Sequence, residues 1–96
     1  MENLNRVKEQ ARDLRREEPR SAYEELGGEA HAARTLDKCR ATLMGWNGDY
    51  EFGCPADLNF FDETGLDMYE FEEFVATGAS DKEVGRWIQQ HARTRS

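Results

Sequence analysis

Between Trp46 and Ser80 the sequence contains no lysine or arginine, although nine of its twenty carboxylates and eight of its ten aromatic residues lie there. Carboxylates need water or partners, and aromatic rings need burial or a ligand. The segment should therefore turn an apolar face inward and an acidic face outward. An acidic centre repels phosphates and anionic lipids, so the sequence predicts neither a nucleic-acid nor a membrane partner. A basic protein segment or a small ligand is the expected complement.

Cysteine and long apolar runs are also scarce. Two cysteines, Cys39 and Cys54, do not make a disulfide framework, so we expect free thiols and a cytoplasmic protein. No apolar run reaches transmembrane length, and the polar start from Glu2 predicts no secretory signal. An EF-hand calcium loop that started at Asp57 or at Asp62 would lack the glycine required at its sixth position. The cysteines and histidines do not have the C-x-x-C or H-x-x-x-H spacing of a zinc site. We therefore expect no metal and no cofactor.

The spacing of apolar residues predicts a mainly α protein. Its 96 residues are enough for one domain with a modest core, 1–96, and ten aromatic residues argue against disorder. We expect four to five helices, the first over 3–16, within a core of 20–92 followed by a frayed tail of 93–96. The segment 46–53 reads as a short β-hairpin or an extended loop, because Asn47-Gly48 is a turn signal.

Helix boundaries are marked by residues that start or stop helices. Pro19 closes the first helix, the second spans 29–44 after Gly27-Gly28, and a short one follows Pro55 over 56–62. Two further helices begin with the capping-box pairs Asp67/Glu70 and Ser80/Glu83. Four apolar stripes at helical spacing should face the core or a partner: Leu4, Val7, Ala11 and Leu14; Ala32, Leu36, Cys39 and Leu43; Met68, Phe71, Phe74 and Val75; and Val84, Trp87, Ile88 and His91.

Cys54 is the sharpest candidate for chemistry. If Pro55 is the first helical residue, Cys54 is the N-cap, where backbone N–H groups favour a nucleophilic or redox-active thiolate. The alternative is a small apolar residue packed beside Phe52 and Phe60, since free cysteine is among the most buried residue types. The sequence leaves both readings open.

A second candidate is the charged face of the helix over 29–44. His31, Arg34, Asp37 and Lys38 recur at steps of three and four, and Arg40 lies nearby. Two cations around a carboxylate could hold an anionic ligand. The alternative is a salt-bridged surface or a link between helices.

A set of short motifs runs through most of the chain: Pro19-Arg20-Ser21, Tyr23-Glu24, Leu26-Gly27-Gly28, Ala33-Arg34, Leu36-Asp37-Lys38, Arg40, Asp49-Tyr50, Cys54-Pro55, Asp57, Phe60-Phe61, Thr64-Gly65, Ser80-Asp81-Lys82-Glu83-Val84 and Trp87. In this combination the chain resembles a family of small bacterial proteins described as a domain of unknown function (DUF5069). The resemblance covers about 13–91 and departs at Ala22, where the family often has proline, and at Leu58-Asn59, where it often has Gln-Arg.

The resemblance implies a fold and a bacterial origin but no activity or cofactor. It includes polar residues that a core does not require, and these form our predicted binding set: Arg20, Ser21, Arg34, Asp37, Lys38, Arg40, Tyr50 and Asp57. We expect one network, with Arg20 and Arg34 pairing with Asp37 and Asp57 and closed by Tyr50. Such a network is either a structural lock of the fold or one wall of a pocket.

Three functional interpretations follow. The leading one is a non-enzymatic binding or interaction module that uses the acidic, aromatic-rich centre. The alternative is a small enzyme or ligand-binding domain with Cys54 as nucleophile or redox thiol, Arg34 as anion clamp, and Asp37 and Tyr50 as acid–base groups. The third is a homodimer through the stripe of the first helix, since a monomer and a homodimer are both compatible with the sequence.

Overall fold

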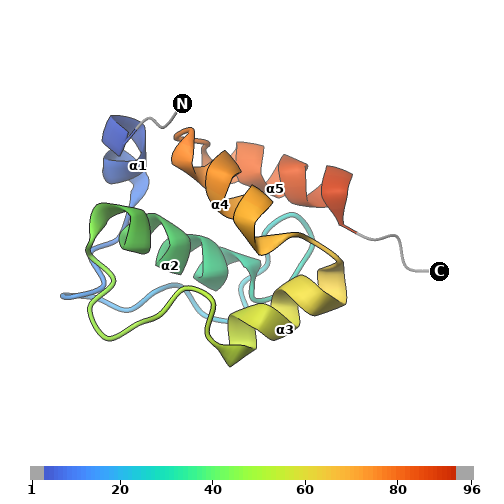
Figure 1. Cartoon of the computed structure of the whole chain (residues 1–96), viewed down its shortest axis with the longest axis horizontal. Coiled ribbons are helices and arrows are strands. Elements are labelled where there is room, and N and C mark those ends of the chain that lie inside the picture. The colour runs from blue at the N-terminus through green and yellow to red at the C-terminus, as the bar shows by residue number, and fades with distance from the viewer. Residues whose placement is uncertain (1–3, 93–96) are drawn as a thin grey trace.

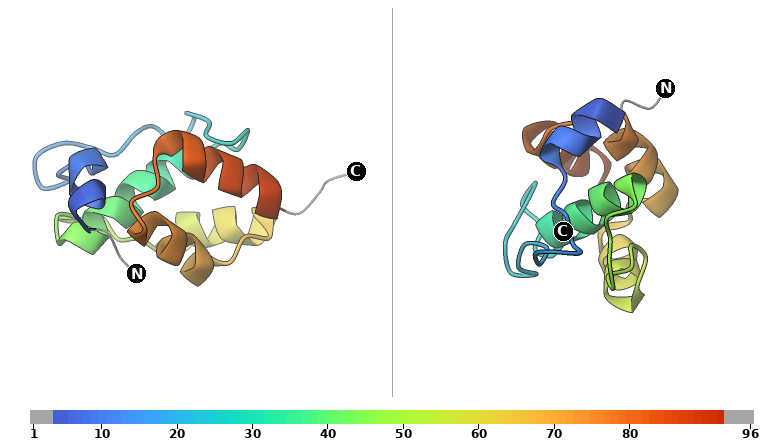
Figure 2. Two further views of the ribbon diagram at one scale, coloured as in Figure 1. Left: turned by 90° about the horizontal axis from the view of Figure 1, so that it is seen from above. Right: turned by 90° about the vertical axis from the view of Figure 1, so that its left-hand side faces the viewer.

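Helix α2 (Ala32–Met44) lies at the centre of the molecule, with the other helices around it (Figures 1 and 2). These are α1 (Leu4–Gln10), α3 (Pro55–Thr64), α4 (Met68–Ala76) and α5 (Asp81–His91). The computed structural model describes residues 4–92 and has no β-strand within that range. The prediction of a mainly α, single compact domain is confirmed. The predicted tail 93–96 and the predicted helix start at residue 3 lie outside the described residues.

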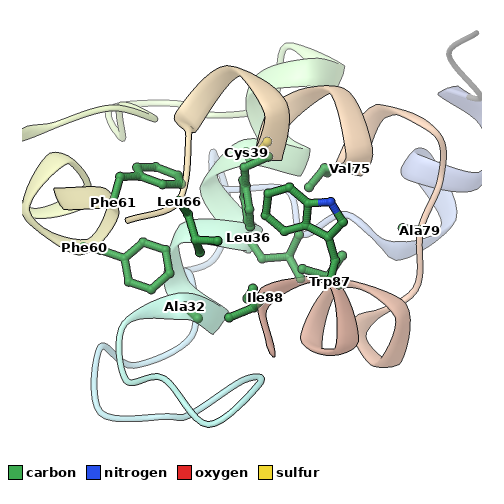
Figure 3. Packing of buried hydrophobic residues seen from close by; sticks show 12 residues of the cluster. Ala32, Leu36, Cys39, Phe60, Phe61, Leu66, Val75, Ala79, Trp87 and Ile88 are labelled. Atoms are coloured by element: carbon green, nitrogen blue, oxygen red, sulfur yellow. The ribbon is translucent and has the colours of Figure 1, made fainter. Parts of the chain in front are cut away.

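Aromatic residues from α3, α4 and α5 fill the core against one face of α2 (Figure 3). Phe71 is fully buried and contacts Phe61 and Trp87 edge-to-face, with ring centroids 5.4 and 5.9 Å apart. Leu36 of α2 and Ile88 of α5 are also fully buried. The stripes predicted on α2, α4 and α5 supply most of this cluster, and Phe60, Phe61, Leu66 and Ala79 supply the rest. His91 of the α5 stripe is exposed and stacks on Trp87.

Helix α2 begins three residues later than the sequence predicts. Leu26 and Glu29 exchange backbone hydrogen bonds of 3.1 and 3.2 Å across Gly27-Gly28, which have φ values of 63° and 80°. Positive φ at both central residues is the conformation of a type I′ turn, which glycine adopts without steric cost. His31 then caps α2 in the left-handed region at φ 74°. The turn thus holds 26–29 outside the helix.

The first helix ends at Gln10 rather than near residue 16. The rest of the predicted helix is a turn around Asp13. The Asp13 carboxylate accepts the Arg15 N–H, and its backbone carbonyl accepts the N–H groups of Arg16 and Glu17. Val7 and Leu14 of the predicted stripe are nevertheless buried within the chain. Leu4 is 42 % exposed, so the stripe is covered only in part within the chain.

The segment 46–53 is a loop with turns, so the extended-loop alternative holds and the hairpin does not. It leads to Cys54, the N-cap of α3. This helix begins at Pro55 and ends at Thr64, so it is longer than the predicted 56–62. Asp67 caps α4 by accepting the N–H groups of Tyr69 and Glu70. Of the two predicted capping boxes, the one at α5, between Ser80 and Glu83, has both of its hydrogen bonds, whereas at α4 only those accepted by Asp67 are present. None of the helices between residues 4 and 92 is both long and apolar enough to cross a membrane.

Candidate functional site

Arg20 and Asp37 form the centre of a first polar cluster. Arg20 donates its backbone N–H to Asp37 Oδ2 at 2.8 Å, and its guanidinium reaches both carboxylate oxygens at 3.0–3.2 Å. Asp37 is 2 % exposed, although it lies on the α2 face away from the hydrophobic cluster. The segment before α2 therefore covers a charged face of that helix.

Asp81, at the start of α5, joins two arginines of this cluster. Its oxygens accept from Arg40 at 2.7 Å and from Arg20 at 2.8 Å. Burial raises the pKa of Asp81, but the hydrogen bonds from Arg40 and Arg20 lower it more, so its pKa is below the ordinary value. Arg40, itself buried, also donates to the Ala79 carbonyl at 2.9 Å. These bonds tie the start of α5 to α2.

A cleft of about 350 Å³ opens beside this cluster. Its walls carry three guanidinium groups, two carboxylates and one amide: Arg12, Arg20, Arg40, Asp37, Asp81 and Gln10. Arg12 is the most exposed of the three arginines, and its Nε lies 3.7 Å from Asp37 Oδ2. The cleft thus carries one more positive than negative charge.

A second polar cluster surrounds Asp57, which is fully buried in the first turn of α3. Lys38 Nζ lies 2.8 Å from Oδ2, and the Gly53 N–H donates to the same oxygen at 2.9 Å. Thr35 donates its hydroxyl to Oδ1 at 3.1 Å, and His31 Nε2 lies 3.1 Å from Oδ1. Burial raises the pKa of Asp57, but these hydrogen bonds and the Lys38 charge outweigh it and lower the pKa.

Cys54 belongs to this second cluster rather than to an apolar packing site alone. Its Sγ lies 3.0 Å from Lys38 Nζ, and Lys38 has a side chain 5 % exposed. Cys54 is half-buried, whereas Cys39 is fully buried in the core and has a pKa raised by that burial. Both thiols are free.

The remaining predicted residues take other roles. The Arg34 guanidinium lies 5.7 Å from the centre of the Tyr50 ring and donates to the Arg20 carbonyl at 3.3 Å. The Ser21 hydroxyl accepts the Tyr23 N–H in a turn. The predicted pair of Arg20 with Asp37 is present, but Lys38 rather than Arg34 pairs with Asp57.

The expected single network is therefore two clusters on two sides of α2. The residues of the enzyme interpretation separate accordingly: Asp37 lines the arginine cleft, Cys54 contacts Lys38, and Arg34 stacks on Tyr50. Within residues 4–92 every buried side-chain nitrogen and oxygen has a hydrogen-bond partner.

A shallow groove of about 520 Å³, lined by apolar and polar groups, lies between α3 and α4. Leu58 and Tyr69 are 49 % and 70 % exposed there, and Met68 is half-buried. The carboxylates of Asp62 and Asp67 stand at its edge on exposed positions. The groove combines an apolar floor with an acidic rim.

Sequence reasoning missed several members of these clusters. Thr35 lies one turn beyond His31 on α2, and this spacing could have identified it as a partner for the same carboxylate. Asp81 looked like an ordinary acidic residue in the first turn of a helix. Arg12 carried no local signal, because its carboxylate partner Asp37 lies 25 positions along the chain.

Comparison with known proteins identifies the family but no activity. A search of curated proteins found no match to this chain. The family model described as a domain of unknown function (DUF5069) matches residues 16–96, which include the groove and both polar clusters except Arg12. The chain therefore belongs to the DUF5069 family.

Proposed function

We propose that this protein is a cytoplasmic, non-enzymatic interaction module whose α3–α4 groove takes a basic, amphipathic protein segment. The observation that carries the proposal is the groove itself, with Leu58, Met68 and Tyr69 exposed or half-exposed beside Asp62 and Asp67. Apolar surface rimmed by charge is typical of protein-binding sites.

The charge around the groove supports a basic partner. Of the nine carboxylates between residues 46 and 80, seven are exposed and one is half-buried, while Asp57 alone is buried against Lys38. Because this segment supplies no lysine or arginine, its surface carboxylates have no cation within the segment to neutralise them. Such a field attracts a cationic segment and repels an acidic one.

The polar clusters support the non-enzymatic part of the proposal. Arg20, Asp37, Arg40 and Asp81 bond one another, and Asp57 accepts from four groups. Groups satisfied in this way fix the topology of the fold without needing a substrate.

The test is an NMR titration of the folded protein with a synthetic peptide of alternating leucine and lysine at helical spacing. We expect shifts confined to residues of α3 and α4 and weaker binding at high salt, since surface charge pairs are screened. The charge reversal Asp62→Lys should weaken binding, while Asp49→Lys, at an exposed position of the 46–53 loop, is the matched control. A peptide with glutamate in place of lysine that binds equally well would contradict the proposal.

A second candidate, a small-ligand site, rests on the arginine cleft. Three guanidinium groups meet there, and Arg12 is 41 % exposed at its side chain. Guanidinium groups recognise carboxylate and phosphate through paired hydrogen bonds. Calorimetry with inorganic phosphate tests it: the candidate requires binding that Arg12→Gln weakens and that Arg15→Gln, outside the cleft, leaves unchanged.

A further inference from the structure

Lys38 and Cys54 bring an amine and a thiol into direct contact across two helices. The 3.0 Å between Nζ and Sγ joins the second turn of α2 to the N-cap of α3. The Cys54 side chain makes no capping hydrogen bond to α3. Its sulfur is therefore engaged with the lysine and not with the helix that it precedes.

The position of the amine is fixed by its second contact. Lys38 Nζ lies 2.8 Å from Asp57 Oδ2, and that carboxylate is held by the Gly53 N–H, Thr35 and His31. Since the lysine side chain is 5 % exposed, it has little room to move to another position. Two reacting atoms held at contact distance react as if at very high concentration.

We propose that oxidation of Cys54 by a hydroperoxide is followed by condensation with Lys38, giving a reversible sulfur–nitrogen cross-link between α2 and α3. Cysteine sulfenic acids are known to condense with a backbone nitrogen, and the amine of Lys38 is the nitrogen in contact here. This modification site is independent of the groove proposed above.

The first step is a two-electron oxidation. The Cys54 sulfur attacks one oxygen of hydrogen peroxide, the O–O bond breaks, and a sulfenic acid and water form. The sulfur is oxidised and the peroxide is reduced, so no further oxidant is needed.

The second step is a substitution without further redox change. The Lys38 ammonium, held 2.8 Å from Asp57, loses one proton to solvent water, and the neutral amine attacks sulfur. The S–O bond breaks, and the departing hydroxide leaves as water with a second proton from nitrogen. One N–H remains in the S–N link.

A disulfide with Cys39 does not compete in this geometry. Cys39 follows Lys38 directly on α2, and successive residues on an α-helix point about 100° apart. Its side chain is fully buried in the hydrophobic core, packed with Leu36 and Val75 in the same cluster, while the Lys38 side chain faces Cys54. The amine, not the second thiol, is the partner that the fold presents to Cys54.

The test uses the Cys39→Ala protein, in which no intramolecular disulfide can form. After mild hydrogen peroxide treatment we expect an intact mass lower by two hydrogen atoms, restored by dithiothreitol. Tryptic digestion should join peptide 35–40, uncleaved after Lys38, to peptide 41–82, which contains Cys54. Oxidised protein that carries only added oxygen on Cys54, or no change at Cys54, overturns the proposal.

The matched variant is Lys38→Arg in the same background. It keeps a cation beside Asp57, but a guanidinium does not displace the sulfenic oxygen. We expect sulfenic acid that dimedone traps and no loss of hydrogen. Circular dichroism shows whether this variant folds. If the Lys38→Arg variant does not fold, the peptide map of the Cys39→Ala protein tests the proposal by itself. A link from Cys54 to any residue other than Lys38 in that map overturns the proposal.

Discussion

Arg20 holds Asp37 with its main chain and its side chain at once. The backbone N–H donates to Oδ2 at 2.8 Å, and the guanidinium contacts both oxygens of the same carboxylate. The two residues are 17 positions apart, so this pair fixes the path of the segment that leads to α2. A charge-assisted, multiply bonded pair of this kind is among the stronger polar contacts in a protein.

Removing the charge of Asp37 should therefore destabilise the fold. Asp37→Asn leaves the Arg20 guanidinium with Asp81 but without the charge of Asp37. Breaking a buried ion pair lowers the free energy of unfolding by roughly 3 kcal/mol. Urea denaturation followed by circular dichroism measures the loss. Glu17→Gln is the control, because its pair with Arg12 has exposed side chains and should matter little. Equal midpoints for the two variants would show that the Arg20–Asp37 pair does not stabilise the fold.

Asp57 should make the stability depend on pH in the acid range. Its pKa is lowered in the folded protein, so the unfolded chain binds a proton at a higher pH than the folded one. Its contribution is then present in full above the ordinary aspartate pKa of about 3.9 and is lost as the pH falls through the lower, folded-state value.

Denaturation midpoints measured from neutral pH down to strongly acid pH test this prediction. Asp57→Asn cannot titrate at this position, so its midpoint should fall less steeply with acid than that of the unchanged protein. The remaining slope comes from carboxylates such as Asp81, whose pKa is also lowered. Parallel curves for the two proteins would contradict a role for Asp57.

The helices could be predicted from sequence because their signals are local. Proline at the start of α3, Asp67 before α4 and the Ser80/Glu83 capping box lie within four residues of the bonds that they form. The lengths of α1 and α2 were overestimated, because the Asp13 turn and the left-handed His31 replace helical hydrogen bonds with equally local ones.

For the polar clusters, the sequence could single out candidate residues but could not predict their burial or all of their partners. The charged face of α2 reads as solvent-facing by periodicity alone, yet Asp37, Lys38 and Arg40 are all buried. Their partners come from segments far along the chain, such as Asp81 for Arg40, and local spacing carries no information on such pairs. The burial of these charges follows from the segments that cover α2.

Gly27 and Gly28 should differ sharply in their tolerance of alanine. Both have positive φ, which costs an L-residue about 1–2 kcal/mol. At Gly27 an added Cβ would also lie 2.6 Å from the Gly85 carbonyl oxygen, whereas at Gly28 it meets nothing within 4 Å. Gly27→Ala should therefore lower the thermal midpoint clearly more than Gly28→Ala. Equal losses would mean that the approach of α5 to this turn is not tight in solution.

Cys39 and Cys54 should differ in reactivity in the folded protein. Cys39 is fully buried and its pKa is raised by burial, so an alkylating reagent should reach it only after denaturation. Cys54 is half-buried at a helix start and should be labelled first. Mass spectrometry of peptides after brief labelling separates the two sites. Labelling of Cys39 at the same rate as Cys54 would indicate that the core opens readily.

Two exposed tyrosines give the sharpest test of the groove. Tyr69 lines it and is 70 % exposed, while Tyr23 is 92 % exposed and lies in the loop before α2. Aromatic residues at the centre of an interface often contribute more than 1 kcal/mol, so Tyr69→Ala should raise the Kd for the leucine–lysine peptide about tenfold. Tyr23→Ala removes the same side chain from a place without a groove and should leave the Kd unchanged. Because both residues are largely solvated, neither change should disturb the fold, and a loss of affinity can be assigned to the contact itself. Equal weakening by both variants would mean that the peptide binds by general attraction to an acidic surface and not in the α3–α4 groove.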